Sequence, residues 1–376
     1  MPQQPISIIG AGIGGLTLAR CLRNHGIPSI LYEKMSSAPR HHYGITLHAS
    51  SYRPLLGVLN LDEATFRRRV AVDGAAGGSG RINPQTVMVA GSTKPHSFRA
   101  NRGRLEQLLG EGLEIKWEQA VEQVEQTPSG IVLRFQDGRK VESGCVIGAD
   151  GPHSRTRQCL SPGTALNVLP IVAYNGRRRV ERAMFDNVYA PFMKRSNVLE
   201  TRLGDTVMNM SLNELTDDFV DLSWTYSRPA RPDDPLHRPN RSNAEATRIP
   251  DDFYTEISAL SDLEPPFKDA FDAGKIKQDR VLHWLMRAGL VKLPDLQAAA
   301  QKGFFFIGDA VHAEPILGGE GANAAMVDGF ELAGCIASGG VAGISTWYEE
   351  QFPRWESGVG ESEMKMLRLY GERKVT

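Results

Sequence analysis

Residues 6–15 read ISIIGAGIGG, a short apolar segment that runs directly into a cluster of glycines. The run Ile6–Ile9 is β-branched and uncharged, which is typical of a buried parallel strand. Gly10, Gly12 and Gly15 then form a GxGxxG pattern. The first glycine permits a tight turn, the second lets the backbone approach a pyrophosphate, and the third lets helix and strand pack closely. The stretch predicts a dinucleotide site at a helix N-terminus.

The residues that follow complete a strand–helix–strand unit. Leu16, Leu18, Ala19 and Leu22 have helical spacing that stops near Gly26, and 29–32 supplies a second strand ending at Glu33. A carboxylate at that point accepts hydrogen bonds from a ribose 2′-OH and disfavours a 2′-phosphate. The first site therefore suits FAD or NAD rather than NADP, and the fingerprint alone does not separate FAD from NAD.

Composition limits the classes of function. The chain has 376 residues, 41% hydrophobic, 23% charged, with a net charge of −1, so about two domains are expected and neither nucleic acid nor an anionic membrane is a predicted partner. The four cysteines lie far apart, without metal-type spacing, and no segment reaches the length of a bilayer span. We expect a cytoplasmic protein, a monomer or homodimer, with no metal site.

Several further elements are expected along the chain. Residues 131–135 and 140–147 predict hairpin strands joined at Asp137-Gly138, and Leu105, Leu108 and Leu109 indicate a short helix. The small residues of 75–83 predict a loop or hairpin between domain segments, and the proline-rich 228–239 predicts a loop. The region from about 166 to 280, with a strand over 220–226, is consistent with a sheet that covers a substrate.

Two later segments separate FAD from NAD. Residues 145–157 read CVIGADGPHSRTR, an apolar strand ending in Asp150-Gly151. Residues 304–332 read FFFIGDAVHAEPILGGEGANAAMVDGFEL, a strand ending in Gly308-Asp309 before a glycine-rich loop and a helix. Together with GxGxxG, these segments give three motifs in a fixed order.

In these motifs the chain resembles the group A FAD monooxygenases, the flavoprotein aromatic hydroxylases, over nearly its whole length. The resemblance implies that Asp309 bonds the ribityl chain of FAD and that Asp150 serves both FAD and the nicotinamide cofactor. Arg102 matches the family's Arg-x-x-Leu, which approaches the flavin's phosphates and ribityl. The implied fold is α/β, with a Rossmann-like FAD-binding domain and a smaller mixed β-sheet substrate domain. We expect the FAD-binding domain over 1–75, 100–165 and 281–376, and the substrate domain over 76–99 and 166–280.

The glycine-rich loop suits a flat ring. Glycines at 318, 319 and 321 allow backbone to lie against an isoalloxazine without a clashing β-carbon. The helix after them, about 322–337, would direct its N-terminus at the pyrimidine edge and stabilise anionic reduced flavin. The predicted FAD contacts here are Gly319, Gly321, Ala322 and Asn323, with Asn323 a candidate cap. One departure concerns the family's proline four residues after the histidine of its GDAxH segment, where this chain has Ile316 preceded by Pro315.

The reaction implied by the resemblance uses NAD(P)H and O2 as co-substrates. A flavin hydroperoxide would hydroxylate or epoxidise a small electron-rich organic substrate, an activity typical of secondary metabolism. The candidate catalytic residues are Arg195, for an anionic or phenolate-like group, and Tyr226, as a hydrogen-bond donor. His283 is a further residue that could face the substrate, and His312 is expected to organise its loop.

Two alternatives stay open. One is another enzyme on the same fold: a halogenase of this lineage would carry a WxWxIP segment, which the sequence lacks, whereas a non-oxygenating FAD oxidoreductase is harder to separate. The other is a protein that retains FAD without redox turnover.

Overall fold

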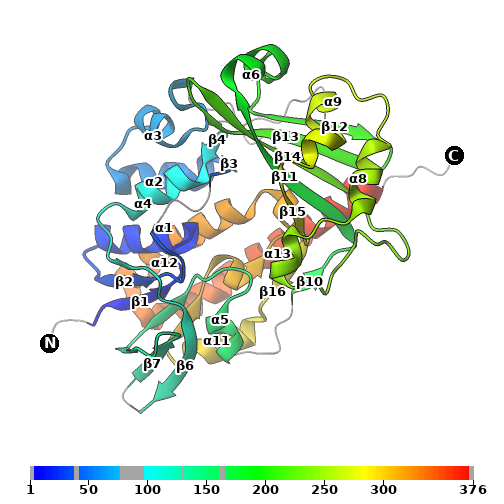
Figure 1. Cartoon of the computed structure of the whole chain (residues 1–376). Coiled ribbons are helices and arrows are strands. Elements are labelled where there is room, and N and C mark those ends of the chain that lie inside the picture. The colour runs from blue at the N-terminus through cyan, green and yellow to red at the C-terminus, as the bar shows by residue number, and fades with distance from the viewer. Residues whose placement is uncertain (1–3, 38–41, 77–96, 129, 161–165, 372–376) are drawn as a thin grey trace.

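The computed structural model of the chain (Figure 1) describes residues 4–37, 42–76, 97–128, 130–160 and 166–371. Its first sheet is parallel, in the order β17-β9-β1-β2-β5. The strands are β1 (Ile6–Ile9), β2 (Ser29–Tyr32), β5 (Ile115–Lys116), β9 (Val146–Gly148) and β17 (Phe304–Phe306). Strands far apart in sequence thus lie side by side, and each of the three motifs follows the carboxyl end of one of them, where ligands bind in open α/β sheets.

Helices cover this sheet and connect it to the rest of the chain. Two of them are α1 (Ile13–Asn24) and α12 (Gly321–Gly339). They pack so closely that a β-carbon at Gly329 would lie only 2.7 Å from the Gly14 carbonyl oxygen, so the contact requires glycine. The remaining helices of this part are α2 (Ala49–Leu59), α3 (Glu63–Val70), α4 (Arg102–Gly110), α5 (Arg155–Leu160), α11 (Leu293–Ala300) and α13 (Ile344–Gly371). Among the helices that the structure describes, none has an apolar stretch that would cross a membrane.

Small antiparallel units are attached to the first sheet. They are β3 (Gly44–Leu47) with β4 (Phe98–Asn101), the meander β6 (Val121–Thr127), β7 (Gly130–Phe135) and β8 (Lys140–Ser143), and the set β10 (Asn167–Val168), β16 (Arg287–Leu290) and β18 (His312–Ala313). The predicted hairpin strand over 140–147 was wrong in extent. The chain leaves the meander at Ser143, and Val146–Gly148 joins the parallel sheet as β9.

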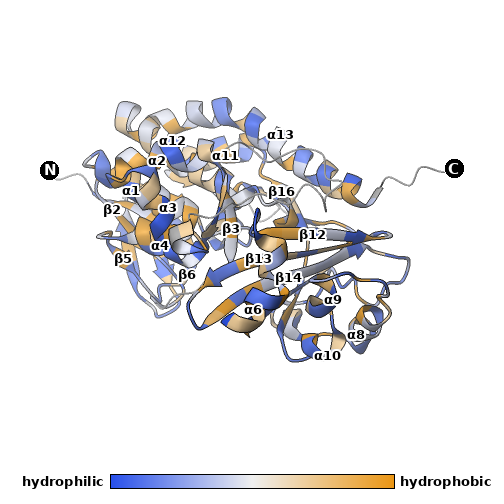
Figure 2. Cartoon of the chain, turned by 90° about the horizontal axis from the view of Figure 1, so that it is seen from above, coloured by the Kyte–Doolittle hydropathy of each residue, from blue (hydrophilic) through white to orange (hydrophobic). Residues whose placement is uncertain are grey.

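The expected smaller sheet is present, but it is antiparallel and not mixed: its order is β12-β13-β14-β11-β15, and every pairing between these strands is antiparallel. Its strands are β11 (Ile171–Glu181), β12 (Val198–Leu203), β13 (Thr206–Leu215), β14 (Phe219–Pro229) and β15 (Arg280–Trp284). Short helices accompany it: α6 (Arg182–Val188), α7 (Ala190–Met193), α8 (Asp251–Ser258), α9 (Phe267–Ala270) and α10 (Ala273–Ile276). Figure 2 shows α13 on one side of this sheet and α8, α9 and α10 on the other.

The loop predicted over 228–239 is only partly a loop. Arg228 and Pro229 end β14, and both Arg228 and Leu236 are 1% exposed. The segment therefore contributes to the core of the second sheet. Of the loop predicted over 75–83, the structure describes only the first two residues, in the 3-10 turn Gly74–Ala76; the others lie outside the described residues.

Candidate functional site

The GxGxxG turn is built so that only glycine fits at two of its positions. Gly10 has a φ of +105°, and a β-carbon there would lie 2.5 Å from the Ala149 carbonyl oxygen. A β-carbon on Gly15 would lie 2.1 Å from the carbonyl oxygen of Gly10. Gly12 is different, because no described atom lies within 4 Å of a β-carbon placed there. The turn is closed by protein around Gly10 and Gly15 and open at Gly12, which fits an approaching pyrophosphate.

Glu33 is buried beside this turn. Its carboxylate accepts hydrogen bonds from the backbone N–H groups of Ala11, at 2.8 Å, and Met35, at 3.0 Å. Each carboxylate oxygen has a second lone pair, so Glu33 can hold the glycine turn and still accept a ribose hydroxyl.

The GD motif and the Arg-x-x-Leu motif meet near the same place. Asp309 lies in the turn Gly308–Ala310 after β17, and burial raises the pKa of its carboxyl, against the attraction of His312 and Arg102. Arg102 is held by Glu106, at 2.9 Å, and by the Tyr43 hydroxyl. Burial alone would lower the pKa of Arg102, but these two partners raise it, so the guanidinium stays charged. A cation and a carboxyl are thereby held near the predicted ribityl position.

The DG motif is tied to the GD motif by Arg157. Asp150 accepts a hydrogen bond from the Thr156 hydroxyl at 2.9 Å, which fixes the carboxylate after β9. Arg157 donates to the carbonyl oxygens of Ala310, at 2.6 Å, and Pro152, at 2.7 Å, so one buried side chain connects both loops. The three sequence motifs are thus brought to one edge of the parallel sheet, as expected.

The glycine-rich loop also fits a flat ligand. Gly319 is left-handed, with a φ of +74°, and a β-carbon there would meet no described atom within 4 Å. A β-carbon on Gly321 would lie 3.3 Å from the Asp309 carboxylate. The helix α12 starts at Gly321, so the N–H groups of Gly321 and Ala322 belong to its first turn, which binds anionic groups.

Asn323 does not cap α12, contrary to the interpretation from sequence. The cap position is Glu320, and the Asn323 amide instead reaches across to β3. Its Oδ1 accepts from the His48 backbone N–H at 2.9 Å, and its Nδ2 donates to the Thr46 carbonyl oxygen at 2.9 Å. Asn323 therefore fixes the distance between α12 and the antiparallel pair β3–β4.

His312 and Asp328 form a buried pair behind the GD loop. His312 Nε2 lies 2.6 Å from Asp328, and its ring stacks on Trp355 with centroids 5.1 Å apart. Asp328 also accepts from Gly308 N–H, at 2.9 Å, and from Trp355 Nε1, at 3.0 Å. Burial disfavours the imidazolium, but Asp328 outweighs this and raises the pKa of His312. These contacts support the expected loop-organising role.

We expect Asp328→Asn to destabilise the apoprotein by about 2–3 kcal/mol. The asparagine amide would leave the buried His312 imidazolium poorly paired, and likewise the other groups that donate to Asp328. Since the pKa of His312 is raised, the pair stabilises the fold fully below about pH 6.5 and loses its contribution as pH rises through the folded-state pKa. Urea unfolding at mildly acidic and alkaline pH should show the deficit shrinking with rising pH. Exposed Glu122→Gln is the control, and a pH-independent deficit would contradict the assignment.

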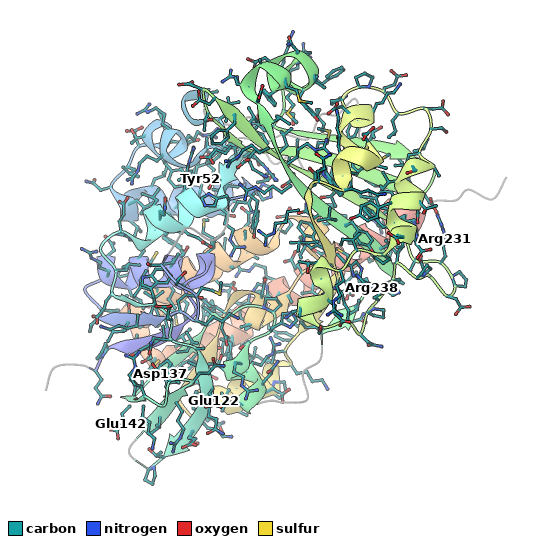
Figure 3. The ribbon with its side chains drawn as sticks, in the orientation of Figure 1. Tyr52, Glu122, Asp137, Glu142, Arg231 and Arg238 are labelled. Carbon is teal, nitrogen blue, oxygen red and sulfur yellow. The ribbon has the colours of Figure 1, made fainter. Side chains whose placement is uncertain are left out.

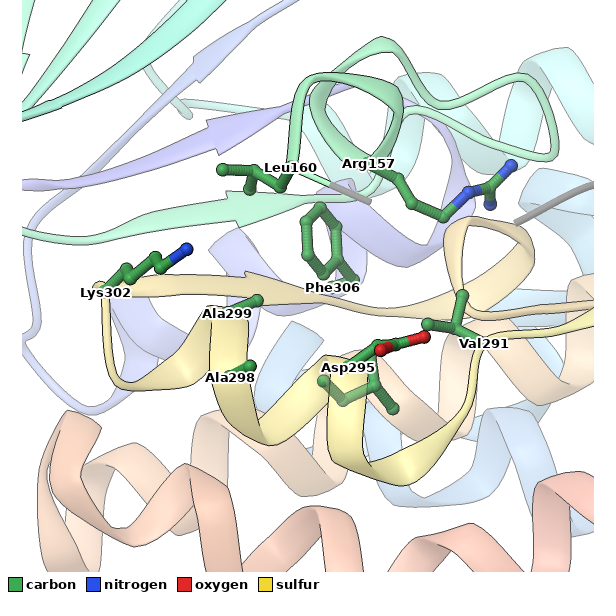
Figure 4. A pocket seen from close by; sticks show the side chains of 9 residues that line it. Arg157, Leu160, Val291, Asp295, Ala298, Ala299, Lys302 and Phe306 are labelled. Carbon is green, nitrogen blue, oxygen red and sulfur yellow. The ribbon is translucent and has the colours of Figure 1, made fainter. Parts of the chain in front are cut away.

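A pocket elsewhere in the FAD-binding part does not include the predicted FAD contacts. Figure 4 shows it between α5 and α11, beside β17. It is lined by Arg157, Leu160, Val291, Asp295, Leu296, Ala298, Ala299, Lys302 and Phe306. Because no glycine of the three motifs contributes to it, we do not assign it to the flavin.

The second sheet turns one face toward the FAD-binding part. We call inner face the set of residues Ala173, Asn175, Glu200, Asn209, Ser211, Ser223, Thr225 and Ser227, which share one side of the strands. The Tyr370 hydroxyl of α13 donates to Ser227 at 2.7 Å, and Ala173 packs in one apolar cluster with Leu317 of the glycine-rich loop. The inner face is thus polar and lies against the elements that carry the flavin motifs.

Arg99 on β4 connects this face to β3. Its Nη2 donates to the Ser211 hydroxyl at 3.1 Å and its Nη1 to the Thr46 hydroxyl at 3.2 Å. The Nε is buried without a hydrogen-bond partner among the described residues, and burial lowers the pKa of Arg99 to about 10. Arg99 was not singled out from sequence, yet it is a cation placed to meet an anionic oxygen.

The two predicted catalytic side chains lie elsewhere. Tyr226 is fully buried on the opposite face of the sheet, where its hydroxyl donates to Glu256 at 2.5 Å and its ring packs on Phe253 of α8. Arg195 is exposed in the turn between α7 and β12. His283 is buried on the Tyr226 side, where its Nδ1 accepts from Arg241 at 2.9 Å. The geometry therefore gives no support to a catalytic role for these residues.

Comparison with known proteins agrees with this geometry. A family model described as FAD binding domain matches residues 3–282. FAD-dependent monooxygenase nscC of Aspergillus fumigatus is 36% identical, over 97% of this chain and 95% of that protein. The chain belongs to the FAD-dependent monooxygenases. FAD-dependent monooxygenase adaC of Aspergillus niger is 34% identical over 97% of this monooxygenase and 93% of its own length.

Solved structures agree at the level of the fold. A putative FAD-containing monooxygenase from Photorhabdus luminescens superposes with a TM-score of 0.72 at 21% identity, over 99% of this chain and all of that one. Klebsiella pneumoniae HpxO, solved with FAD and uric acid, gives a TM-score of 0.69 at 16% identity, over 98% and 89% of the two chains. This monooxygenase is therefore an FAD-binding oxidoreductase, as the three motifs predicted.

Proposed function

We propose that this monooxygenase uses NAD(P)H and O2 to hydroxylate or epoxidise a small electron-rich organic substrate held between the inner face and the flavin. The observation that carries the proposal is the placement of a polar sheet face opposite the glycine-rich loop, with Lys365 of α13 donating to the Gly318 carbonyl oxygen at 3.5 Å. When bound, FAD supplies the redox chemistry. The protein binds and orients the reactants and excludes water from them.

The residues proposed to hold FAD belong to the three motifs and the start of α12. They are Gly10, Gly12, Gly15, Glu33, Arg102, Asp150, Asp309, Gly319, Gly321, Ala322 and Asn323. The division into 1–75, 100–165 and 281–376 against 76–99 and 166–280 also stays a proposal. The strand β15 crosses its boundary at 281 and pairs with β11 of the second sheet.

Cationic side chains near the DG motif support an anionic nicotinamide cofactor. His153 follows Asp150-Gly151, and burial together with the charges of Arg287, Lys34 and Arg157 lowers the pKa of His153. Lys34 is exposed after β2 and Arg287 lies on β16, so these two cations can meet an anionic pyrophosphate, whereas the buried Arg157 is held by the carbonyl oxygens of Ala310 and Pro152.

The decisive experiment follows the oxygen atom. The FAD-loaded protein is mixed with NADH or NADPH and a panel of phenols, and substrate-stimulated O2 uptake is recorded under 18O2. We expect one labelled oxygen atom in the product. Flavin reduction without labelled product would favour a non-oxygenating oxidoreductase, and the absence of any reduction by NAD(P)H would favour FAD retention without turnover.

A further inference from the structure

A buried histidine connects three distant segments at the start of α12. His48 Nδ1 lies 2.9 Å from the Ser97 hydroxyl, and His48 Nε2 lies 3.1 Å and 3.2 Å from the two carboxylate oxygens of Glu320. His48 follows β3, Ser97 precedes β4, and Glu320 is the N-cap residue of α12. The side chain of His48 is 4% exposed and that of Glu320 is 26% exposed. We call these three residues the His48 network.

The chemistry of the three groups shows what His48 does. An ionised carboxylate only accepts hydrogen bonds, so His48 Nε2 carries a proton and donates to Glu320. The Ser97 hydroxyl can donate to Nδ1 or accept from it, so it holds the ring in either protonation state. His48 is the N-cap residue of α2, yet its ring makes no cap bond to that helix. The imidazole is therefore held for Glu320 and not for its own helix.

The network lies at the predicted FAD contacts. Asn323, three residues after Glu320, accepts from the His48 backbone N–H at 2.9 Å, so both residues tie the start of α12 to the same segment. Gly321 follows Glu320 directly, and its β-carbon position is 3.3 Å from the Asp309 carboxylate. Glu320 is thus a carboxylate at the N-terminus of the helix whose first residues are proposed to contact FAD.

A carboxylate at this place opposes a second negative charge. Reduction of FAD adds two electrons and one proton and leaves an additional negative charge on the ring. The N-terminus of α12 favours an anion, but Glu320 already places one there, and like charges repel most strongly where water is excluded. A hydrogen bond from His48 offsets part of the charge of Glu320, so it reduces this repulsion.

We propose that His48 is a positioning residue for flavin reduction: by pairing with Glu320, it raises the preference of the protein for reduced over oxidised FAD. The inference rests on the proposed FAD contacts at the start of α12. Ser97 keeps the imidazole in place, and His48 acts through Glu320 without contacting the flavin or the substrate itself.

The midpoint potential of bound FAD measures this preference without turnover. The FAD-loaded protein is reduced with dithionite in the presence of a reference dye, at one fixed pH. We expect Glu320→Gln to raise the potential, because a neutral amide removes the repulsion, and His48→Leu to lower it, because Glu320 loses a donor. Each change should alter the ratio of the affinities for reduced and oxidised FAD about tenfold, which is roughly 30 mV for a two-electron couple.

A double variant distinguishes this pairing from a merely structural effect. Without the carboxylate His48 has no charge to offset, so adding His48→Leu to Glu320→Gln should change the affinity ratio less than about twofold. Glu142→Gln removes the same charge from exposed β8, at the far end of the FAD-binding part (Figure 3), and should behave as the wild type.

Fluorescence titration with oxidised FAD supplies the second measurement. Weaker FAD binding in His48→Leu with an unchanged potential would mean that His48 only supports the fold, and would overturn the proposal. An unchanged potential in Glu320→Gln, loss of FAD binding in that variant, or an equal effect of His48→Leu with and without Glu320 would do the same. If the expected shifts appear but the 18O2 experiment gives no labelled product, the proposed reaction fails and the role of His48 stands.

Discussion

Replacing Gly12 with alanine is expected to leave the apoprotein folded and to abolish its retention of FAD. Gly12 has a φ of −82°, which alanine adopts freely, and its added β-carbon would meet no described atom within 4 Å. The apoprotein should therefore stay within about 1 kcal/mol of wild type, the usual difference between glycine and alanine at a helix N-cap. The open space at Gly12 is where the pyrophosphate must approach, so the methyl group should collide with FAD itself.

The matched variant is Gly15→Ala, three residues further on. Its β-carbon would lie 2.1 Å from the carbonyl oxygen of Gly10, a backbone atom that cannot move without opening the turn. We expect this variant to lose about 3 kcal/mol or more of stability in the absence of FAD. The two variants thus distinguish an effect on FAD binding, expected for Gly12→Ala, from an effect on the stability of the apoprotein, expected for Gly15→Ala.

Fluorescence titration of each apoprotein with FAD, beside urea unfolding without it, measures both effects. For Gly12→Ala the dissociation constant should rise about a hundredfold or more, which is roughly 2.7 kcal/mol of binding free energy. If Gly12→Ala bound FAD as tightly as the wild type, the assignment of this turn to the pyrophosphate would be untenable.

The motifs and strands of the FAD-binding part could be predicted from the sequence because each pattern lies within a few neighbouring residues. Each motif directly follows a short strand: the glycines of GxGxxG follow β1, Asp150-Gly151 follows β9 and Gly308-Asp309 follows β17. The steric need for glycine at Gly10 or Gly15 arises within the turn or from the neighbouring strand. The positions of Glu33, Asp150 and Asp309 after their strands follow from the same local pattern. Asn323 was misread because its partners, Thr46 on β3 and His48 directly after it, are far away in the sequence.

The proposed substrate face of the second sheet could not be predicted in the same way, because contacts between distant parts of the chain determine which face lies toward the flavin. In β14 the residues Val220, Leu222, Trp224 and Tyr226 alternate with polar ones, and β13 alternates in the same way. That period of two was a readable signal that Tyr226 belongs to an apolar core and Thr225 to the opposite face. Which face meets the flavin depends on α13 and the pair β3–β4, and no pattern within β12, β13 or β14 shows this.

Arg228→Met should cause the largest loss of stability in the second sheet, about 3–5 kcal/mol near neutral pH. Arg228 is 1% exposed, and its Nη2 reaches Glu256 at 2.8 Å and Asp234 at 3.2 Å. Removing the guanidinium leaves two carboxylates in the core without their counter-charge. Burial alone would raise the pKa of Asp234, yet the hydrogen bonds from Arg228 hold it at about 2.

The sign of the pH dependence follows from this lowered pKa. The pairing stabilises the wild type above the ordinary aspartate pKa and is lost as pH falls through the folded-state value, so the deficit of Arg228→Met should shrink between about pH 4 and 2. Arg231→Met is the matched control, since Arg231 is 57% exposed and approaches the same Glu256 only to 3.4 Å. We expect it to cost less than about 1 kcal/mol.

Because Arg228 lies with Tyr226 on the face away from the flavin, its loss should affect stability and spare the cofactor. Urea unfolding of both variants, with FAD affinity measured below the transition, tests this separation. A fall in FAD affinity in Arg228→Met without loss of stability would mean that the face carrying Arg228 and Tyr226 affects the flavin site. The division of the sheet into a structural face and a substrate face would then have to be abandoned. Equal stability losses in the two variants would instead show that burial does not govern the strength of these ion pairs.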